Sequence, residues 1–313
     1  MKIIKITAAF LCLTALAACE GYEMFEEELY EKIVYVLTKE DNQVFSEVHS
    51  LDEDVSKGNV IVMVSGSLQV TEPVTVEFES DPKALDEYNE KMFGVEEDKY
   101  LKPLASSFYE IPSMKVTVDP TDIPARAYLP IHVMPEGLSP DSTYFIPLKI
   151  KSASIDSISE EHSNVMYRVF IKNKYADQQE QTLYSMRGEK TESGKVPYTI
   201  MTNKVILPIS KNKIRTTIEQ KAFEAKMDVI NSSCMVIEIN ADNSLTITPF
   251  NSDFVDIEMV SQEGYNQYRQ DSAGNYRFYL SYRYRTRSSA DADFGEWVGI
   301  TENLLRYVEI LDI

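Results

Sequence analysis

The sequence lacks the residue patterns from which most active sites are built. It has three histidines, at positions 49, 132 and 162, and none has a second histidine at metal-ligand spacing. A zinc site of the usual cysteine and histidine type is therefore not expected. The Gly-x-Ser-x-Gly elbow, the phosphate-binding glycine loop and Gly-x-Gly-x-x-Gly are also missing. We predict a protein that is not an enzyme and that has no metal or cofactor.

Acidic residues leave two alternatives open. Among the 50 acidic residues, any two can be drawn as a glycoside hydrolase pair, but the sequence does not give the carboxyl separation that this chemistry requires. Asp291 and Asp293 could bind calcium through their oxygens. The full calcium-loop pattern is missing, however, which favours a solvated loop.

Cysteine is scarce, with residues at positions 12, 19 and 234. Cys12 belongs to the N-terminal leader described below and Cys19 is the expected lipidation site, which leaves Cys234 without a partner for an intramolecular disulfide. Cys234 begins an apolar run and no catalytic motif accompanies it, so we expect a buried structural thiol rather than a nucleophile.

Positive charge is also scarce. The chain has 31 lysines and arginines against 50 acidic residues, and its net charge is −19. This excess of negative charge argues against nucleic acid and against anionic lipid headgroups as partners.

The N-terminus has the organisation of an export signal. Lys2 and Lys5 precede an apolar stretch, 8–18, which is too short to span a bilayer as a stable helix. It ends in Leu16-Ala17-Ala18-Cys19, which resembles the lipobox of bacterial lipoproteins. The resemblance implies cleavage before Cys19 and acylation of its thiol and its new amino group. The alternative is an ordinary secretory signal in which Cys19 lies near the cleavage site by chance.

Lipidation would make a transmembrane helix unnecessary, because several acyl chains on one residue hold a protein on a membrane. Without residues 1–18, which include two lysines, 295 residues with a net charge of −21 remain, enough for about two domains. The acidic segment 20–28 resembles the surface-export signal of Bacteroides-type lipoproteins. It implies an outer-membrane, lipid-anchored protein that faces the cell exterior. A solvated tether on a periplasm-facing anchor is the alternative.

The N-terminal half shows the pattern of short strands at turn-like intervals. The predicted strands are 33–37, 60–64, 74–78, 115–118, 128–133, 144–150 and 167–171. One helix interrupts them, with Asp81 as N-cap, Pro82 in the first position and Gly94 after the last turn. Its apolar stripe consists of Leu85, Tyr88 and Met92.

The C-terminal half has the pattern of an antiparallel meander. Its predicted strands are 236–240, 245–248, 254–260, 276–286 and 296–300, with a hairpin turn at 241–244. A short amphipathic helix over 219–228 could precede them. Between the halves, 172–188 is polar and rich in glutamine and glutamate, which indicates a domain boundary.

We therefore predict an all-β protein of two domains. A signal peptide (1–18) and an acidic lipidated tether (19–30) precede an N-terminal immunoglobulin-like β-sandwich with one short helix (31–174). A C-terminal β-domain (184–313) follows, which is an antiparallel meander forming a sandwich or a partial barrel.

Several segments of this chain resemble a known pair of domains. Tyr100-Leu101-Lys102-Pro103-Leu104, together with 81–89, 107–109 and 143–150, resembles an N-terminal domain of unknown function. That domain occurs in Bacteroides-type lipoproteins of polysaccharide-utilisation loci. Tyr184-Ser185-Met186-Arg187-Gly188, with 242–247 and 279–284, resembles the C-terminal β-domain of unknown function that usually follows it. The resemblance implies glycan binding or adhesion at the cell surface, beside an outer-membrane transporter. It supplies no established ligand residues.

The segment 276–287 has two unlike faces if it is a strand. One face carries Tyr276, Phe278, Leu280, Tyr282 and Tyr284, and the other carries Arg277, Tyr279, Ser281, Arg283, Arg285 and Arg287. In one interpretation the aromatic face is core, and the arginines pair across strands with Asp256 and Glu258. In the other, the arginines and Tyr279 form a binding surface, because a guanidinium fork suits carboxylates or sulfates.

Sugar-binding sites usually present an aromatic face to the ring, with a few polar groups that fix its orientation. The predicted ligand-binding residues are Trp297, Tyr265, Tyr268, Tyr279, Arg283 and Arg285. The alternative for Trp297, the only tryptophan, is a core position in the final hairpin.

The sequence thus predicts a non-catalytic cell-surface lipoprotein that captures glycans for a polysaccharide-uptake system. Its partners would be a glycan or polysaccharide and an outer-membrane transporter complex, with membrane contact through the lipid anchor only. The alternative function is a structural or adhesive surface protein that binds another protein.

The anchor prediction can be tested with Cys19→Ala. Because this thiol is the expected acyl acceptor, the variant should lose metabolic labelling by a clickable fatty acid and should leave the membrane fraction. Cys12→Ala, which changes a cysteine inside the leader, should keep the label. Undiminished labelling of Cys19→Ala would remove the basis of the anchor.

Overall fold

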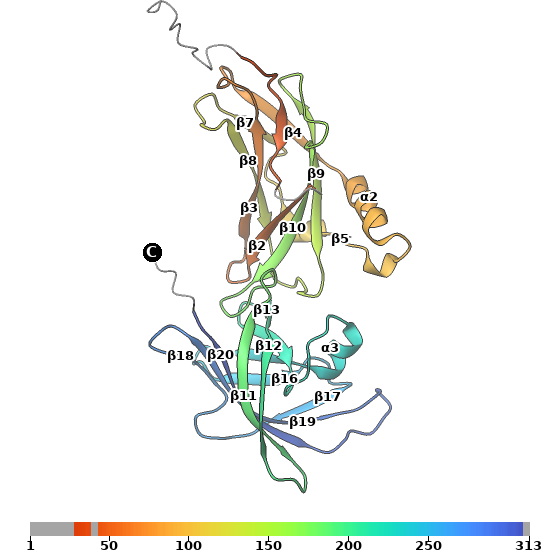
Figure 1. Cartoon of the computed structure of the whole chain (residues 1–313), viewed down its shortest axis with the longest axis vertical. Coiled ribbons are helices and arrows are strands. Elements are labelled where there is room, and N and C mark those ends of the chain that lie inside the picture. The colour runs from red at the N-terminus through yellow and green to blue at the C-terminus, as the bar shows by residue number, and fades with distance from the viewer. Residues whose placement is uncertain (1–27, 39–42, 309–313) are drawn as a thin grey trace, which may run out of the picture.

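The computed structural model describes residues 28–38 and 43–308 of the chain. The predicted signal peptide, Cys19 and most of the tether lie outside the described residues. Two β-rich domains stand end to end along the long axis of the molecule (Figure 1). The predicted all-β, two-domain fold is confirmed.

Two sheets form the N-terminal sandwich. The first has the order β1 (Val34–Val36), β3 (Ser56–Val64), β8 (Arg126–Val133) and β6 (Tyr109–Glu110). The second has the order β2 (Val44–Ser50), β10 (Asn164–Lys172), β9 (Tyr144–Ala153), β4 (Val74–Ser80) and β7 (Lys115–Val118), and β5 (Lys102–Pro103) also pairs with β9. Alternate residues of both sheets meet in one core that includes Val60, Val76, Leu129 and Val169, each fully buried.

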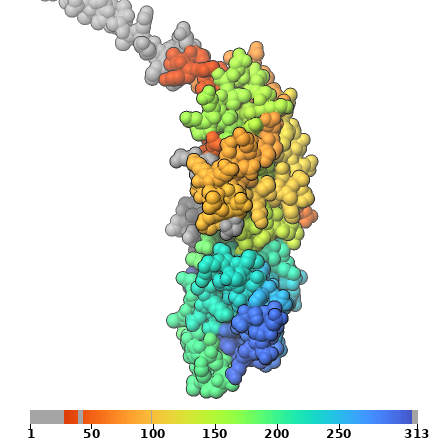
Figure 2. All heavy atoms as spheres, turned by 90° about the vertical axis from the view of Figure 1, so that its right-hand side faces the viewer, coloured from red at the N-terminus to blue at the C-terminus, as the bar shows by residue number. Residues whose placement is uncertain are grey.

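The predicted helix is α2 (Pro82–Phe93), and it lies on the surface of the N-terminal domain (Figure 2). Two short 3-10 helices follow it, η1 (Glu97–Lys99) and η2 (Ser106–Phe108). The predicted apolar stripe is only partly correct: Leu85 is buried, but Met92 is 50% exposed. Asn89, and not Met92, is buried against the rest of the domain. Its side chain donates to the Leu101 carbonyl at 3.0 Å and accepts from the Leu101 amide at 2.9 Å.

Two further sheets form the C-terminal domain. The larger has the order β12 (Tyr198–Val205), β11 (Leu183–Glu192), β20 (Val298–Arg306), β19 (Tyr276–Thr286) and β17 (Val255–Met259), and β18 (Gln267–Gln270) also pairs with β19. The smaller is a meander of β13 (Leu207–Ser210), β14 (Lys213–Thr217), β15 (Cys234–Ile239) and β16 (Leu245–Pro249). Cys234 is 1% exposed in the core between them.

The helix expected over 219–228 is misplaced. The helix in this region is α3 (Met227–Ser233), and residues 219–226 are not helical. No helix in the described ranges is long and apolar enough to cross a membrane.

The connector between the domains, 173–182, is more ordered than its polar composition indicates. Tyr175 and Ala176 are buried, and Asn173 donates to the carbonyls of Ser210 and Lys213 at 2.7 and 3.0 Å. The second part of the predicted polar boundary, from Leu183 onward, is strand β11 in the middle of a sheet.

A buried ion pair lies within the C-terminal domain, between two strands of its larger sheet, β12 and β20. Lys204 Nζ lies 2.7 Å from Glu302 Oε2, and neither side chain has exposed surface. Lys204 also donates to the Thr217 carbonyl at 2.8 Å, and the Tyr282 hydroxyl donates to Glu302 at 3.1 Å. Burial lowers the pKa of Lys204 and raises the pKa of Glu302, so each group depends on the other to remain charged.

Lys204→Met tests this pair. The variant leaves Glu302 buried without its cation, and we expect the free energy of unfolding to fall by about 3–5 kcal/mol. Lys204→Met/Glu302→Leu should recover much of that loss, because it removes both charges. Urea unfolding measures the free energy of unfolding of the single and the double variant. Lys151→Met, which removes an exposed partner of Glu77, is the control and should leave the midpoint unchanged. A Lys204→Met midpoint equal to that control would contradict the expectation.

Candidate functional site

The larger C-terminal sheet has one face in the core and one in solvent. On β19 the core face carries Phe278, Leu280 and Tyr282, each 0% exposed, as the alternation predicts. We call the solvent-facing side the outer face. Its residues include Ser185, Arg187, Met201, Asn203, Arg269, Arg277, Tyr279, Arg283, Arg285, Trp297, Asn303 and Leu305.

Arginines and aromatic rings alternate on one part of the outer face. We call this set the arginine ladder, and it consists of Arg283, Trp297, Arg285, Phe294 and Arg287. The guanidinium carbons of Arg283 and Arg285 lie 4.6 and 4.5 Å from the Trp297 ring centre. Those of Arg285 and Arg287 lie 5.0 and 4.6 Å from the Phe294 ring centre. These distances are those of cation–π contacts, which hold the guanidinium groups in place.

Cross-strand acids contact the same arginines. Residues Asp256 and Glu258 of β17 stand opposite Arg285 and Arg283 of β19. Arg285 Nε donates to Asp256 at 2.9 Å, and Arg283 Nε donates to Glu258 at 2.7 Å. The predicted cross-strand pairing is confirmed. The side chains of Arg283 and Arg285 nevertheless stay 46% and 35% exposed, and each guanidinium has five N–H donors, more than one carboxylate uses.

Five of the six predicted ligand residues lie together on the outer face. Trp297 is half-buried there, outside the core. Tyr279 is also half-buried, and Tyr265 meets it edge to face with ring centres 6.3 Å apart. Arg283 and Arg285 belong to the ladder described above.

The prediction for Tyr268 is wrong. Tyr268 lies in β18, is 4% exposed and points into the core. Its ring packs against Tyr175 and Phe278, with ring centres 5.2 and 5.1 Å apart. Its ring is therefore not presented at the surface for a ligand.

A cleft of about 620 Å³ occupies the other end of the outer face, over β12, β11 and β20. We call it the Arg187 cleft, and its side chains include Ser185, Arg187, Met201, Asn203, Asn303, Leu305 and Tyr307. None of its lining residues is acidic. Arg187 has no ion-pair or hydrogen-bond partner on its side chain within ranges 28–38 and 43–308. Sequence reasoning did not select these residues. The signal that could have found Arg187 is the alternation along β11, where Ser185 and Arg187 face away from the buried Tyr184 and Met186.

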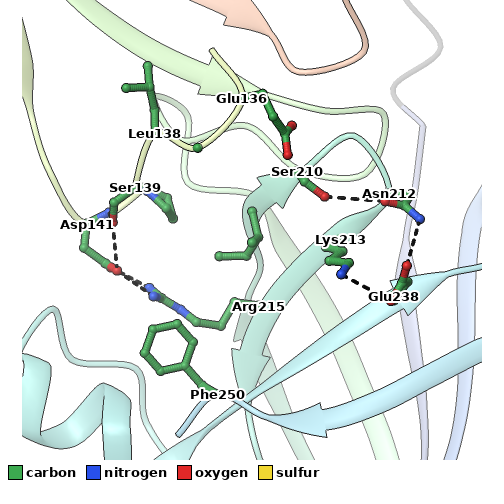
Figure 3. A pocket seen from close by; sticks show the side chains of 13 residues that line it. Glu136, Leu138, Ser139, Asp141, Ser210, Asn212, Lys213, Arg215, Glu238 and Phe250 are labelled. Carbon is green, nitrogen blue, oxygen red and sulfur yellow. Dashed lines mark hydrogen bonds and ion pairs between the residues drawn. The ribbon is translucent and has the colours of Figure 1, made fainter. Parts of the chain in front are cut away.

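A second cavity, of about 640 Å³, lies between the two domains (Figure 3). Asp141 of the N-terminal domain and Arg215 of the C-terminal domain face each other across it, joined by two hydrogen bonds. Arg215 is 1% exposed and its guanidinium carbon lies 4.9 Å from the Phe250 ring centre. Nearby, Lys213 pairs with Glu238 at 3.3 Å. Because these charges contact one another, the cavity is better suited to joining the domains than to holding a ligand.

Metal ligands do not cluster in the part of the chain that the structure describes. It contains no group of three or more histidine, cysteine, aspartate or glutamate side chains placed to hold an ion. Asp291 and Asp293 are both exposed in the β19–β20 loop.

Two protein-family models match the chain. One is described as an N-terminal domain and matches residues 30–157, and the other is described as a C-terminal domain and matches 163–304. The second match begins at β10, although β10 pairs with β2 and β9 of the N-terminal sandwich. No curated protein shows significant sequence similarity to the chain.

Several solved structures share the fold over nearly the whole chain. A protein of unknown function from Bacteroides ovatus is 12% identical with a TM-score of 0.61, and the match covers 88% of this chain and 94% of that one. A multidomain protein including DUF1735 from Bacteroides ovatus is 12% identical with a TM-score of 0.59, covering 87% and 94%. An auxiliary nutrient binding protein from Bacteroides thetaiotaomicron is 12% identical with a TM-score of 0.58, covering 86% and 92%. At these identities the likeness shows the fold alone.

The junction between the domains can be tested with Arg215→Met. Asp141 would then lose the partner that offsets its partial burial, and the free energy of unfolding should fall by about 3 kcal/mol. Because the domains would separate more easily, limited proteolysis within 173–182 should also become faster. Arg126→Met, which changes an exposed arginine on β8, should affect neither measurement. An unchanged cleavage rate in Arg215→Met would show that this ion pair does not hold the domains together.

Proposed function

The chain belongs to the two-domain proteins that join these N-terminal and C-terminal domains, and we propose that it captures a nutrient glycan without catalysing a reaction. One structural neighbour is described as an auxiliary nutrient binding protein, which supports a role of this kind. Because folds of one kind can carry different functions, the proposal depends on the site rather than on the fold.

The observation that carries the proposal is the composition of the outer face. Aromatic rings and hydrogen-bonding side chains share one solvent-facing surface, and the ladder fixes Arg283, Trp297 and Arg285 against one another. A pyranose ring needs this combination, since its apolar face packs on an aromatic ring and its hydroxyls need polar partners. Side chains that are already held in place lose little conformational entropy when a ligand binds.

The place of action is also a proposal. Lipid on Cys19 would attach the protein to the outer membrane, and the acidic segment that follows would direct it to the cell exterior. There it would deliver the glycan to an outer-membrane transporter complex. The leader, the Leu16-Ala17-Ala18-Cys19 motif and the acidic segment support this location.

Glycan capture can be measured with the 20–313 fragment and a panel of soluble polysaccharides in affinity electrophoresis, with product analysis alongside. We expect retardation by at least one polysaccharide and no shortened product. Shortened product would indicate a glycoside hydrolase instead. Retardation by none, together with self-association or binding of another protein, would favour the adhesive alternative.

Trp297→Ala tests the contribution of the ladder. If the indole contacts the sugar, its loss should weaken binding of the retarding polysaccharide by about 1–3 kcal/mol, or roughly ten- to more than a hundredfold. Because Trp297 lies on the outer face, the melting temperature should change little. Tyr128→Ala, at a 47% exposed aromatic residue of the N-terminal domain, is the matched control and should bind normally. A large drop in melting temperature with undiminished affinity would give Trp297 a structural role only.

A further inference from the structure

We propose that the outer face selects an acidic glycan, and that Arg187 binds the carboxylate or sulfate group of that glycan within the Arg187 cleft. This inference rests on the proposed function and specifies the class of ligand. A uronate supplies a carboxylate and a sulfate ester supplies a sulfate, and both groups are oxyanions that an arginine can bind.

The distribution of arginine is the first observation. The chain contains ten arginines in all, and six of them lie on the outer face or at its edge: Arg187, Arg269, Arg277, Arg283, Arg285 and Arg287. The chain as a whole has a net charge of −19, which repels a polyanion over most of the surface. A polyanion would therefore approach where arginine is concentrated.

The state of Arg187 is the second observation. Three of the other arginines of the outer face pair with acids, namely Arg277 with Asp271, Arg283 with Glu258 and Arg285 with Asp256. The remaining two have neutral partners: Arg269 donates to the Gln267 side chain at 3.0 Å, and Arg287 donates to the Asp253 carbonyl. Arg187 is exposed and pairs with no carboxylate among the described residues. The next acid on its side of β11, Glu189, is not part of the cleft lining. The guanidinium of Arg187 is thus available for a bidentate contact with an oxyanion.

The rest of the cleft suits a sugar ring. Met201 and Tyr307 are 66% and 68% exposed and offer apolar surface beside the arginine. Ser185 and Asn203 offer hydroxyl and amide groups for sugar hydroxyls. A ring that packs on the apolar side chains would present its charged substituent to Arg187.

The cleft and the aromatic residues are continuous across the sheet. Arg187 stands opposite Asn303 of β20, and Asn303 stands opposite Tyr279 of β19. Neighbouring strands are about 4.8 Å apart, so Arg187 and Tyr279 are separated by about 10 Å along this row. A chain of a few sugars can therefore contact both.

Matched polysaccharides test the proposal on the 20–313 fragment. Polygalacturonate and highly methyl-esterified pectin share a backbone but differ in carboxylate charge, and chondroitin sulfate and desulfated chondroitin differ in sulfate. We expect one acidic member to bind at least tenfold more tightly than its matched partner. The binding should weaken as NaCl is raised from 50 to 500 mM, because salt screens charge pairs.

Arg187→Gln should reduce binding of that acidic polysaccharide at least tenfold, whereas Arg187→Lys should recover part of it, because a lysine keeps the charge without the fork. Arg126→Gln, at an exposed arginine on β8, is the control and should bind normally. Should Arg187→Gln fail to fold, Met201→Glu places a negative charge on an exposed side chain of the cleft and should weaken binding of the acidic polysaccharide alone.

The outcomes separate the two proposals. Equal binding of charged and uncharged partners would overturn the acidic-glycan inference and leave glycan capture intact. If Arg187→Gln and Met201→Glu bind the acidic polysaccharide as tightly as the unaltered protein does, the proposed role of Arg187 is overturned. Binding of an acidic protein but of no polysaccharide would overturn both proposals.

Discussion

The alternation of side chains along β19 determines on which side of the sheet the arginines of this strand lie. Phe278, Leu280 and Tyr282 are fully buried, so the register of this strand is fixed by the core. A slip of one residue would exchange the two faces and bury arginines in place of aromatic rings, at a cost of several kcal/mol for each unpaired charge. The neighbouring strands are held in the same way, because the Lys204–Glu302 pair joins β12 and β20 within that core. The geometry of the outer face is thus a consequence of packing on the opposite side of the sheet.

The junction extends this rigidity to the whole molecule. The Asp141–Arg215 pair, the Asn173 side chain and the bond from Arg306 to the Tyr175 carbonyl at 3.0 Å all cross or brace the boundary between the domains. The first described residues lie at the end of the N-terminal domain that is remote from the C-terminal domain (Figures 1 and 2). If Cys19 carries the anchor, the N-terminal sandwich acts as a spacer that holds the outer face away from the membrane.

Sequence reasoning succeeded where a strand alternates cleanly, and β7 and β19 have the predicted bounds. It failed where a buried residue is polar. Strand β2 was missed because His49, which is 0% exposed and 2.9 Å from the Tyr167 hydroxyl, interrupts the apolar pattern. Tyr268 was misplaced because part of its burial comes from Tyr175, which belongs to the distant connector between the domains. The Arg187 cleft was missed for the same reason, since it requires β11 and β20, from opposite ends of the domain, to be neighbours.

The two interpretations of the arginine-rich strand are compatible, although the sequence presents them as rivals. An arginine that pairs with an acid across the strands gives up part of its charge to that acid but keeps N–H donors for a ligand. Arg283 and Arg285 therefore contribute shape and hydrogen bonds more than net charge. Arg187 differs because its charge is not offset by a partner among the described residues. Attraction of an anion to the cleft therefore depends on Arg187, whose side chain has no hydrogen-bond or ion-pair partner among the described residues, and the paired arginines determine which ligand shapes fit beside it.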